Sequence, residues 1–282
     1  MADDLDQLRE WVGRKEVRTD IVTPWPITAL SATVDDPTVE AAEGKPVPPG
    51  WHWIFFLEAK PPSQVGPDGH PRKGGFLPPV PLPRRMWAGG RIEFVRPLVI
   101  GQNVARESEI LSVEPKSGRT GSLVFVTVRQ TVKAGGETAI VEEQDIVYRE
   151  AAKKGDPVAP GKQALTGAQW SRSVMPDSVM LFRYSALTFN GHRIHYDRDY
   201  AINEEHYPGL VVHGPLQATL LLDLCRTNCE RPLRKFEYRA QSPLFAGSPF
   251  TVNGIFDAAS SQADVWTASE AGNYAMRGTA SF

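Results

Sequence analysis

The segment LTFNGHRIHYDRDYA, residues 187–201, gathers side chains that can transfer protons or bind a metal. His192 and His195 stand close together, Asn190 precedes them and Asp197 follows. Histidine has an ordinary pKa of about 6.5, so it can give and take protons at neutral pH. The segment is therefore an acid–base site, a metal site or a hydrogen-bonded loop.

A metal site is the least favoured of these interpretations. His192, His195 and Asp197 are suitable ligand types, but no neighbouring glutamate or cysteine completes the set in an obvious way. The chain has only 2 cysteines. Cys225 and Cys229 are spaced for ordinary packing on one helix face. We therefore expect no bound metal.

Composition excludes several classes of protein. The 282 residues carry a formal net charge of -2, so no global basic field attracts nucleic acid or an anionic membrane. No apolar run is long enough to span a bilayer, and the acidic start MADDLDQLREWVGR has no secretory apolar region. Together with the low cysteine count, these features predict a cytoplasmic protein.

The first half of the chain is expected to be mainly strands. Residues 5–12 predict a short amphipathic helix, and the apolar run 51–59 is a strand or a buried helix, between which periodicity cannot choose. Residues 60–85 contain so many prolines and glycines that neither a helix nor an inner strand can persist. Four segments between 90 and 150, rich in Val, Ile, Phe and Thr, predict an antiparallel meander.

The second half repeats this plan. A Lys/Gly/Pro-rich stretch at 151–163 predicts a boundary between domains 1–150 and 164–282. After it, a helical stretch at 214–228 precedes further strands, as the apolar run precedes the strands of the first half. PLVIG in the first half also matches PLFAG in the second. We expect one shape to occur twice, a helix wrapped by a curved antiparallel sheet.

The motifs now indicate a family. HYDRDYA at 195–201, followed by YPGLVVHGPLQATLLLDL at 207–224, resembles the hydratase 2/MaoC-like branch of the hotdog fold. YSALTFNGHRIHYD together with YPGLVVHGPL resembles a narrower group within it. That group contains mesaconyl-C4-CoA, itaconyl-CoA and methylfumaryl-CoA hydratases and mitochondrial 3-hydroxyacyl-thioester dehydratases. RRMWAGGRIEFVRPLVIG resembles the companion domain of double-hotdog dehydratases.

This resemblance implies a fold and a different role for each half of the chain. The fold class is α+β, a double hotdog of two antiparallel sheets, each wrapped round a central helix. Residues 1–150 are expected to form a degenerate N-terminal hotdog with a structural or coenzyme A-binding role. Residues 164–282 are expected to form the MaoC-like hotdog that carries the active site.

One departure from the family motif affects the chemistry. The common pattern is G-D-x-N-P-x-H, and this chain has Asn190 at the Asp position and His192 at the Asn position. Only His195 carries over directly, so it is the expected acid–base residue. An amide cannot take a proton, so Asn190 can only orient water or substrate. Gly214, at a helix start, is expected to donate a backbone N–H to the thioester oxyanion.

Arginines are candidates for binding the negative charges of the substrate. Arg183 and Arg193 can pair with a free carboxylate. Arg84, Arg85 and Arg91 can pair with coenzyme A phosphates. For each of them, a solvated surface charge is the alternative.

Other side chains near the motif have less specific roles. His192 points into the site or away from it, depending on whether its segment is helical or extended. His213 is expected to support the helix start, and Asp197 to anchor the local turn or to act as a helix N-cap. Tyr184 and Ser185 line the pocket or belong to the core and caps.

The resemblance implies a hydratase or dehydratase of short acyl-CoA thioesters, with a branched or dicarboxylic substrate such as mesaconyl-C4-CoA or itaconyl-CoA. Coenzyme A is then part of the substrate and no separate cofactor is expected. The alternatives are a 3-hydroxyacyl dehydratase acting on an acyl carrier protein, a non-catalytic thioester-binding protein, and a peptide-binding role for FLPPVPLPRR. The chain can act alone or as a homodimer of double hotdogs.

Overall fold

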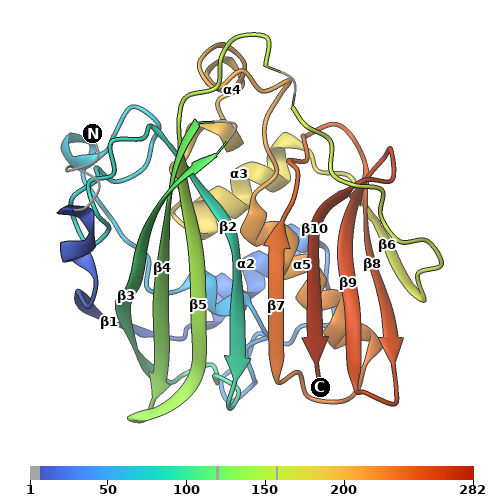
Figure 1. Ribbon diagram of the computed structural model, residues 1–282. Coiled ribbons are helices and arrows are strands. Elements are labelled where there is room, and N and C mark those ends of the chain that lie inside the picture. The colour runs from blue at the N-terminus through green and yellow to red at the C-terminus, as the bar shows by residue number, and fades with distance from the viewer. Residues whose placement is uncertain (1–6, 119–120, 157) are drawn as a thin grey trace.

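The computed structural model describes residues 7–118, 121–156 and 158–282 (Figure 1). These residues form one antiparallel sheet of 10 strands in the order β1-β3-β4-β5-β2-β7-β10-β9-β8-β6. The strands are β1 (Lys15–Ile21), β2 (Arg84–Phe94), β3 (Asn103–Gly118), β4 (Gly121–Ala134), β5 (Glu137–Arg149), β6 (Trp170–Val174), β7 (Lys235–Ala240), β8 (Phe250–Asp257), β9 (Gln262–Ser269) and β10 (Tyr274–Ser281).

The sheet contains the predicted repeat. Counted outward from the centre, β2-β5-β4-β3-β1 in one half corresponds strand by strand to β7-β10-β9-β8-β6 in the other. The shared PLxxG motifs mark equivalent turns, because Gly101 after β2 and Gly247 after β7 both have left-handed backbones, with φ of 100° and 86°. The two expected sheets are in fact one, since β2 pairs with β7 and Ile92 lies opposite Phe236.

The predicted meander is correct for β3, β4 and β5, which pair in chain order. It is wrong for β2, which lies between β5 and β7. The described residues of 151–163 belong to no helix or named strand, and the domain division placed there stays a prediction.

The helices are α2 (Pro24–Val34), α3 (Ser178–Leu187), α4 (Arg198–Asn203) and α5 (Gly214–Asn228), with 3-10 turns η1 (Leu8–Trp11), η2 (Trp51–Ile54), η3 (Pro62–Gln64) and η4 (Arg193–His195). Of the short helix expected at 5–12, residues 5 and 6 lie outside the described part of the chain. None of the described helices is long and apolar enough to cross a membrane.

The two halves differ in the helix that packs on the sheet. In the second half α5 lies against the sheet and contacts β6, β8, β9 and β10 (Figure 1). Its residues from Leu216 to Cys225 are all buried. In the first half the apolar run forms only η2, because the chain is extended at Phe55 and left-handed at Phe56 (φ 58°), which ends the turn. The expected helix is therefore reduced to one turn, whose Trp51 Nε1 donates to Asp223 on α5 at 3.0 Å.

Candidate active site

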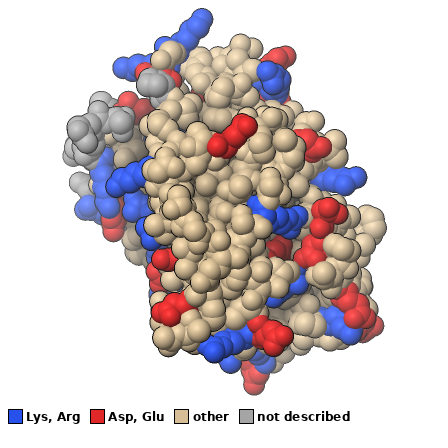
Figure 2. Space-filling view, turned by 90° about the vertical axis from the view of Figure 1, so that its right-hand side faces the viewer, with Lys and Arg blue, Asp and Glu red and all other residues tan. Residues whose placement is uncertain are grey.

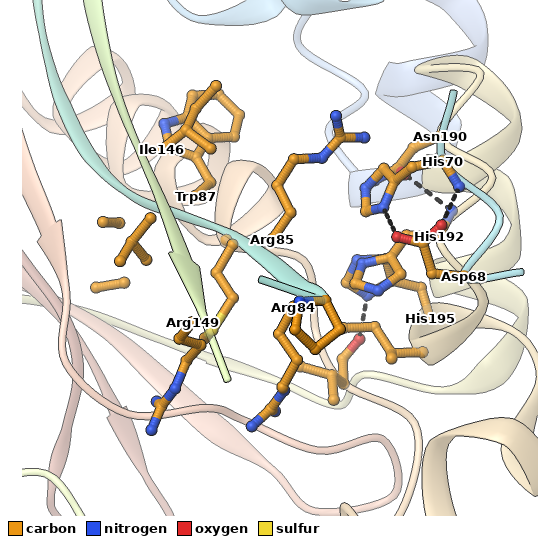
Figure 3. A pocket seen from close by; sticks show the side chains of 18 of the residues that line it. Asp68, His70, Arg84, Arg85, Trp87, Ile146, Arg149, Asn190, His192 and His195 are labelled. Carbon is orange, nitrogen blue, oxygen red and sulfur yellow. Dashed lines mark hydrogen bonds and ion pairs between the residues drawn. The ribbon is translucent and has the colours of Figure 1, made fainter. Parts of the chain in front are cut away.

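A cleft of about 1280 Å³ lies where the two halves meet. Its walls include the proline-rich loop (residues 60–83), the start of β2, the segment 190–195 and the start of α5. Six of the residues predicted from the sequence line it, namely Arg84, Arg85, Asn190, His192, His195 and Gly214. Figure 3 shows most of them together with Asp68 and His70, which the sequence did not single out.

His195 is a buried, neutral imidazole at the wall of this cleft. Its Nδ1 lies 2.7 Å from the carbonyl oxygen of Val211. A carbonyl only accepts hydrogen bonds, so Nδ1 carries the proton and Nε2 keeps a free lone pair. Burial lowers the pKa of His195 to about 4, although the Val211 hydrogen bond opposes the shift. His195 is therefore in the correct state to act as a base at neutral pH.

Tyr184 and His213 lie behind His195 and outside the residues that line the cleft. The His213 ring stacks on His195 with centroids 3.7 Å apart, and its Nε2 is 2.8 Å from the Ser185 hydroxyl. His213 occupies the N-cap position of α5 without a capping side-chain bond. It supports the helix start by packing, and Tyr184 does the same through its hydroxyl, 3.4 Å from Thr219.

Asn190 faces the cleft at the end of the turn that follows α3. Its Oδ1 accepts a hydrogen bond from the backbone N–H of His192 at 3.0 Å. Because the amide oxygen is used in this turn, the amide N–H groups are the part that can donate to water or substrate.

His192 is buried between two other histidines. Its ring centroid is 4.1 Å from that of His70 and 5.4 Å from that of His195. Burial, together with these two neighbours, holds the pKa of His192 far below its ordinary value. The side chain therefore points into the site, and it is neutral.

His70 and Asp68 reach the site from the proline-rich loop of the first half. His70 Nδ1 lies 2.9 Å from Asp68 Oδ2. Burial and the charge of Arg85 lower the pKa of His70, against the raising effect of Asp68. The only sequence signal for this pair is the DGH triplet inside the proline-rich loop. No motif connects it to residues more than a hundred positions later.

Asp68 and His70 are also the residues to consider when asking whether the site binds a metal. One ligand atom each from Asp68, His70 and His192 lie within 4.8 Å of one another. The hydrogen bond between Asp68 and His70 and the nearby charge of Arg85 favour a hydrogen-bonded pair over a cation here. The absence of a metal stays a prediction.

Arg193 holds the proline-rich loop in place. Its backbone N–H donates to Asp68 O at 2.9 Å and its Nη1 donates to Pro67 O at 3.0 Å. Its guanidinium also pairs with Asp197 at 2.8 Å. Asp197 is the N-cap of α4, as predicted, and accepts from the Tyr200 N–H at 3.0 Å. Arg193 is therefore placed as a loop anchor and does not line the cleft.

The remaining arginines divide into paired and unpaired cations. Arg183 is exposed on α3 and Arg91 is paired with Glu143 and Asp145, and neither lines the cleft. Arg84 lines it, but its Nε already pairs with Glu205 at 2.7 Å. Arg85 also lines it and forms no ion pair with a carboxylate of the described residues. In Figure 3 its side chain turns away from those of Arg84 and Arg149.

The ten-stranded sheet, whose strand order repeats outward from its centre, together with the buried helix α5, defines the fold as a double hotdog. A solved MaoC-like dehydratase superposes with a TM-score of 0.71 over 98% of both chains, at 15% identity. A Mycobacterium tuberculosis protein described as having a double hotdog fold gives 0.60 over 98% of this chain and 97% of its own, at 13% identity.

Sequence comparison identifies the family. Residues 50–246 match the model of hydroxyacyl-thioester dehydratase type 2. The mesaconyl-C(4)-CoA hydratase of Chloroflexus aurantiacus is 49% identical over 85% of this chain and 86% of its own. The mitochondrial hydroxyacyl-thioester dehydratase type 2 of Schizosaccharomyces pombe is 27% identical over 86% of this chain and 90% of its own. The chain belongs to the hydroxyacyl-thioester dehydratase type 2 family.

Proposed function

We propose that this chain is a hydro-lyase that adds water to the double bond of a short enoyl-CoA carrying a free carboxylate, such as mesaconyl-C4-CoA, and catalyses the reverse dehydration. The observation that carries the proposal is the neutral imidazole of His195 at the wall of a cleft that also contains the start of α5. The carboxylated substrate class is supported by the 49% identity to a mesaconyl-C4-CoA hydratase.

Hydration needs a base for water, an oxyanion site and a proton for the α-carbon. Water, held by the Asn190 amide, loses a proton to His195 Nε2 while its oxygen bonds to the β-carbon. The π electron pair moves toward the thioester oxygen, which the N–H of Gly214 at the positive end of α5 stabilises. The resulting enolate then takes a proton at the α-carbon.

A carrier-protein substrate is the second candidate, because the fission yeast relative is named a hydroxyacyl-thioester dehydratase. An acidic acyl carrier protein would dock on a concentrated basic surface. On the face shown in Figure 2, Lys and Arg are scattered among Asp and Glu without such a patch. This face offers no such docking site, and the 49% identity to a mesaconyl-C(4)-CoA hydratase favours coenzyme A as the carrier. The cytoplasmic location and the homodimer stay predictions.

Direct assay tests the proposal. Purified protein is mixed with mesaconyl-C4-CoA, itaconyl-CoA and crotonyl-CoA, and hydration is followed by product chromatography. We expect turnover of a carboxylated substrate at a higher kcat/KM than that of crotonyl-CoA. Turnover of crotonyl-CoA alone would contradict the carboxylated class, and binding without any turnover would make the chain a thioester-binding protein.

Arg85 is the expected partner of the substrate carboxylate, because it lines the cleft beside the histidines and forms no ion pair with a carboxylate among the described residues. A charged hydrogen bond of this kind contributes about 1.5–3 kcal/mol, so Arg85→Gln should lower kcat/KM for mesaconyl-C4-CoA about 10–10²-fold. The value for crotonyl-CoA should change little. Arg91→Gln removes a paired arginine outside the cleft and is the control. An equal loss on both substrates in Arg85→Gln would contradict the assignment.

A further inference from the structure

The loop that carries Asp68 and His70 is built against the active-site segment. A Cβ added to Gly69 would lie 1.8 Å from the carbonyl oxygen of Gly191, so the two backbones are in direct contact. Within the loop, Gly66 N–H donates to His70 O at 2.7 Å and the Asp68 carboxylate accepts from His70 N–H at 3.1 Å. The positions of Asp68 and His70 are therefore fixed by hydrogen bonds and close packing.

His70 is oriented as a proton-transfer group. Asp68 Oδ2 can only accept, so the Nδ1 of His70 carries the proton of their 2.9 Å bond and Nε2 remains for chemistry. A carboxylate fixes the tautomer of a histidine and stabilises its imidazolium form. The partner of His195 is a neutral carbonyl of Val211, which stabilises an imidazolium less. Compared with His195, His70 is therefore better supported in the protonated state.

We propose that His70 is a second catalytic residue, the group that gives a proton to the α-carbon in hydration and removes it in dehydration, and that Asp68 is its positioning residue. This inference rests on the proposed function. The family motif has an aspartate where this chain has Asn190. In this proposal Asp68, in the first half of the chain, supplies a carboxylate to the site, and it acts through His70.

The proton count closes over one turnover. His195 takes one proton from water, whose oxygen forms the new bond to the β-carbon. The enolate takes the Nε2 proton of His70, and the product has gained one H and one OH. His195 then releases its proton to solvent, and His70 takes one up to restore the starting state. The low pKa of His195 favours the release.

A negatively charged substrate supports these two roles, with His195 as the base and His70 as the proton donor. The charged or titratable groups that interact with His70 include Arg85, Lys73, Asp68, His192 and His195. Burial, followed by the charges of Arg85 and Lys73, lowers the pKa of His70, and Asp68 raises it. A substrate carboxylate paired with Arg85 offsets the effect of Arg85, so His70 takes up a proton more readily with substrate bound than without it.

The test is the pH dependence of kcat, which reports the enzyme–substrate complex, for wild type, His70→Gln and Asp68→Asn with mesaconyl-C4-CoA. We expect wild-type kcat to fall at alkaline pH as His70 loses its proton. His70→Gln should lower kcat about 10²-fold and abolish this fall. Asp68→Asn should move the fall to lower pH, because the carboxylate no longer stabilises the imidazolium. A purely structural role would lower rates without moving the profile.

Controls keep the outcomes distinct. Asp257→Asn alters an exposed carboxylate that likewise accepts from backbone N–H, that of Ala259 at 3.0 Å, and should change nothing. Thermal unfolding and crotonyl-CoA binding show whether the variants fold. If His70→Gln keeps the wild-type kcat and the wild-type pH profile, the role of His70 is wrong and the proposed function stands. The same holds if a chelator abolishes the activity of the wild-type enzyme and zinc restores it. Wild type inactive on every thioester would overturn the proposed function and this inference together.

Discussion

Replacing His195 by glutamine is expected to lower kcat for hydration about 10²–10⁴-fold, the contribution of a positioned acid–base group. Glutamine keeps a polar side chain of similar length but cannot take the proton of water. Substrate binding should change much less than kcat, because the thioester is held by other groups. Single-turnover kinetics with mesaconyl-C4-CoA, together with a separate binding measurement, would check this.

The pH profile adds a second expectation for the same residue. A base works only when unprotonated, and burial lowers the pKa of His195 to about 4. The wild-type rate should therefore not fall on the acid side until the pH is well below 6.5. A fall centred near 6.5 that disappears in His195→Gln would contradict the buried, neutral state. Cys229→Ser, at the far end of α5, is a suitable control for handling and stability.

The second large effect is expected from Gly69→Ala. Gly69 has a φ of +89°, and an added Cβ would lie 1.8 Å from the backbone oxygen of Gly191. The Gly191 carbonyl belongs to the backbone and cannot move aside as a flexible side chain can. The proline-rich loop must therefore separate from the segment that carries His192. Asp68 and His70 move with it. We expect kcat to fall about 10²-fold, as for loss of the His70 proton donor, and the melting temperature to drop.

Gly74→Ala is the matched control for this prediction. Gly74 lies in the same loop with nearly the same φ, +88°, but the nearest atom to an added Cβ is Pro79 Cβ at 3.5 Å, an ordinary contact. Both variants carry the cost of a left-handed alanine, about 1–2 kcal/mol. Only Gly69→Ala adds the clash. If the two variants lose kcat equally, loop docking is not what places His70.

Short motifs predicted the part of the site that is local in sequence. The spacing from Asn190 to His195, and a helix start at Gly214, were enough to bring these residues to one cleft. Such motifs fix backbone turns within a few residues, so they carry geometry with them. Arg84 and Arg85 were expected as partners of coenzyme A phosphates or as solvated charges. That Arg84 is ion-paired depends on Glu205, which no pattern indicated.

The parts that the sequence did not predict depend on distant contacts. Arg193 has its ion-pair partner Asp197 in its own segment, but only the docked loop shows that the carbonyl oxygens of Pro67 and Asp68 also accept its hydrogen bonds. His70 was missed for the same reason, since its neighbour His192 is far away in the chain. The run after Gly50 was apolar enough for a helix, but the left-handed Phe56 that ends it is a backbone feature that apolar periodicity does not report.

The two halves of the sheet are covered by helices of unequal length, and this difference affects how many equivalent sites the molecule can have. In a pair of identical subunits every substitution occurs twice, so a helix cannot be shortened in one without being shortened in both. Here β2 and β7 join two halves of one gene product, and each half has its own sequence. One half could therefore exchange a long helix for a single turn and a proline-rich loop. Among the described residues His70, His192 and His195 therefore gather in one cleft lined from both halves, whereas two identical subunits would repeat any such cleft twice.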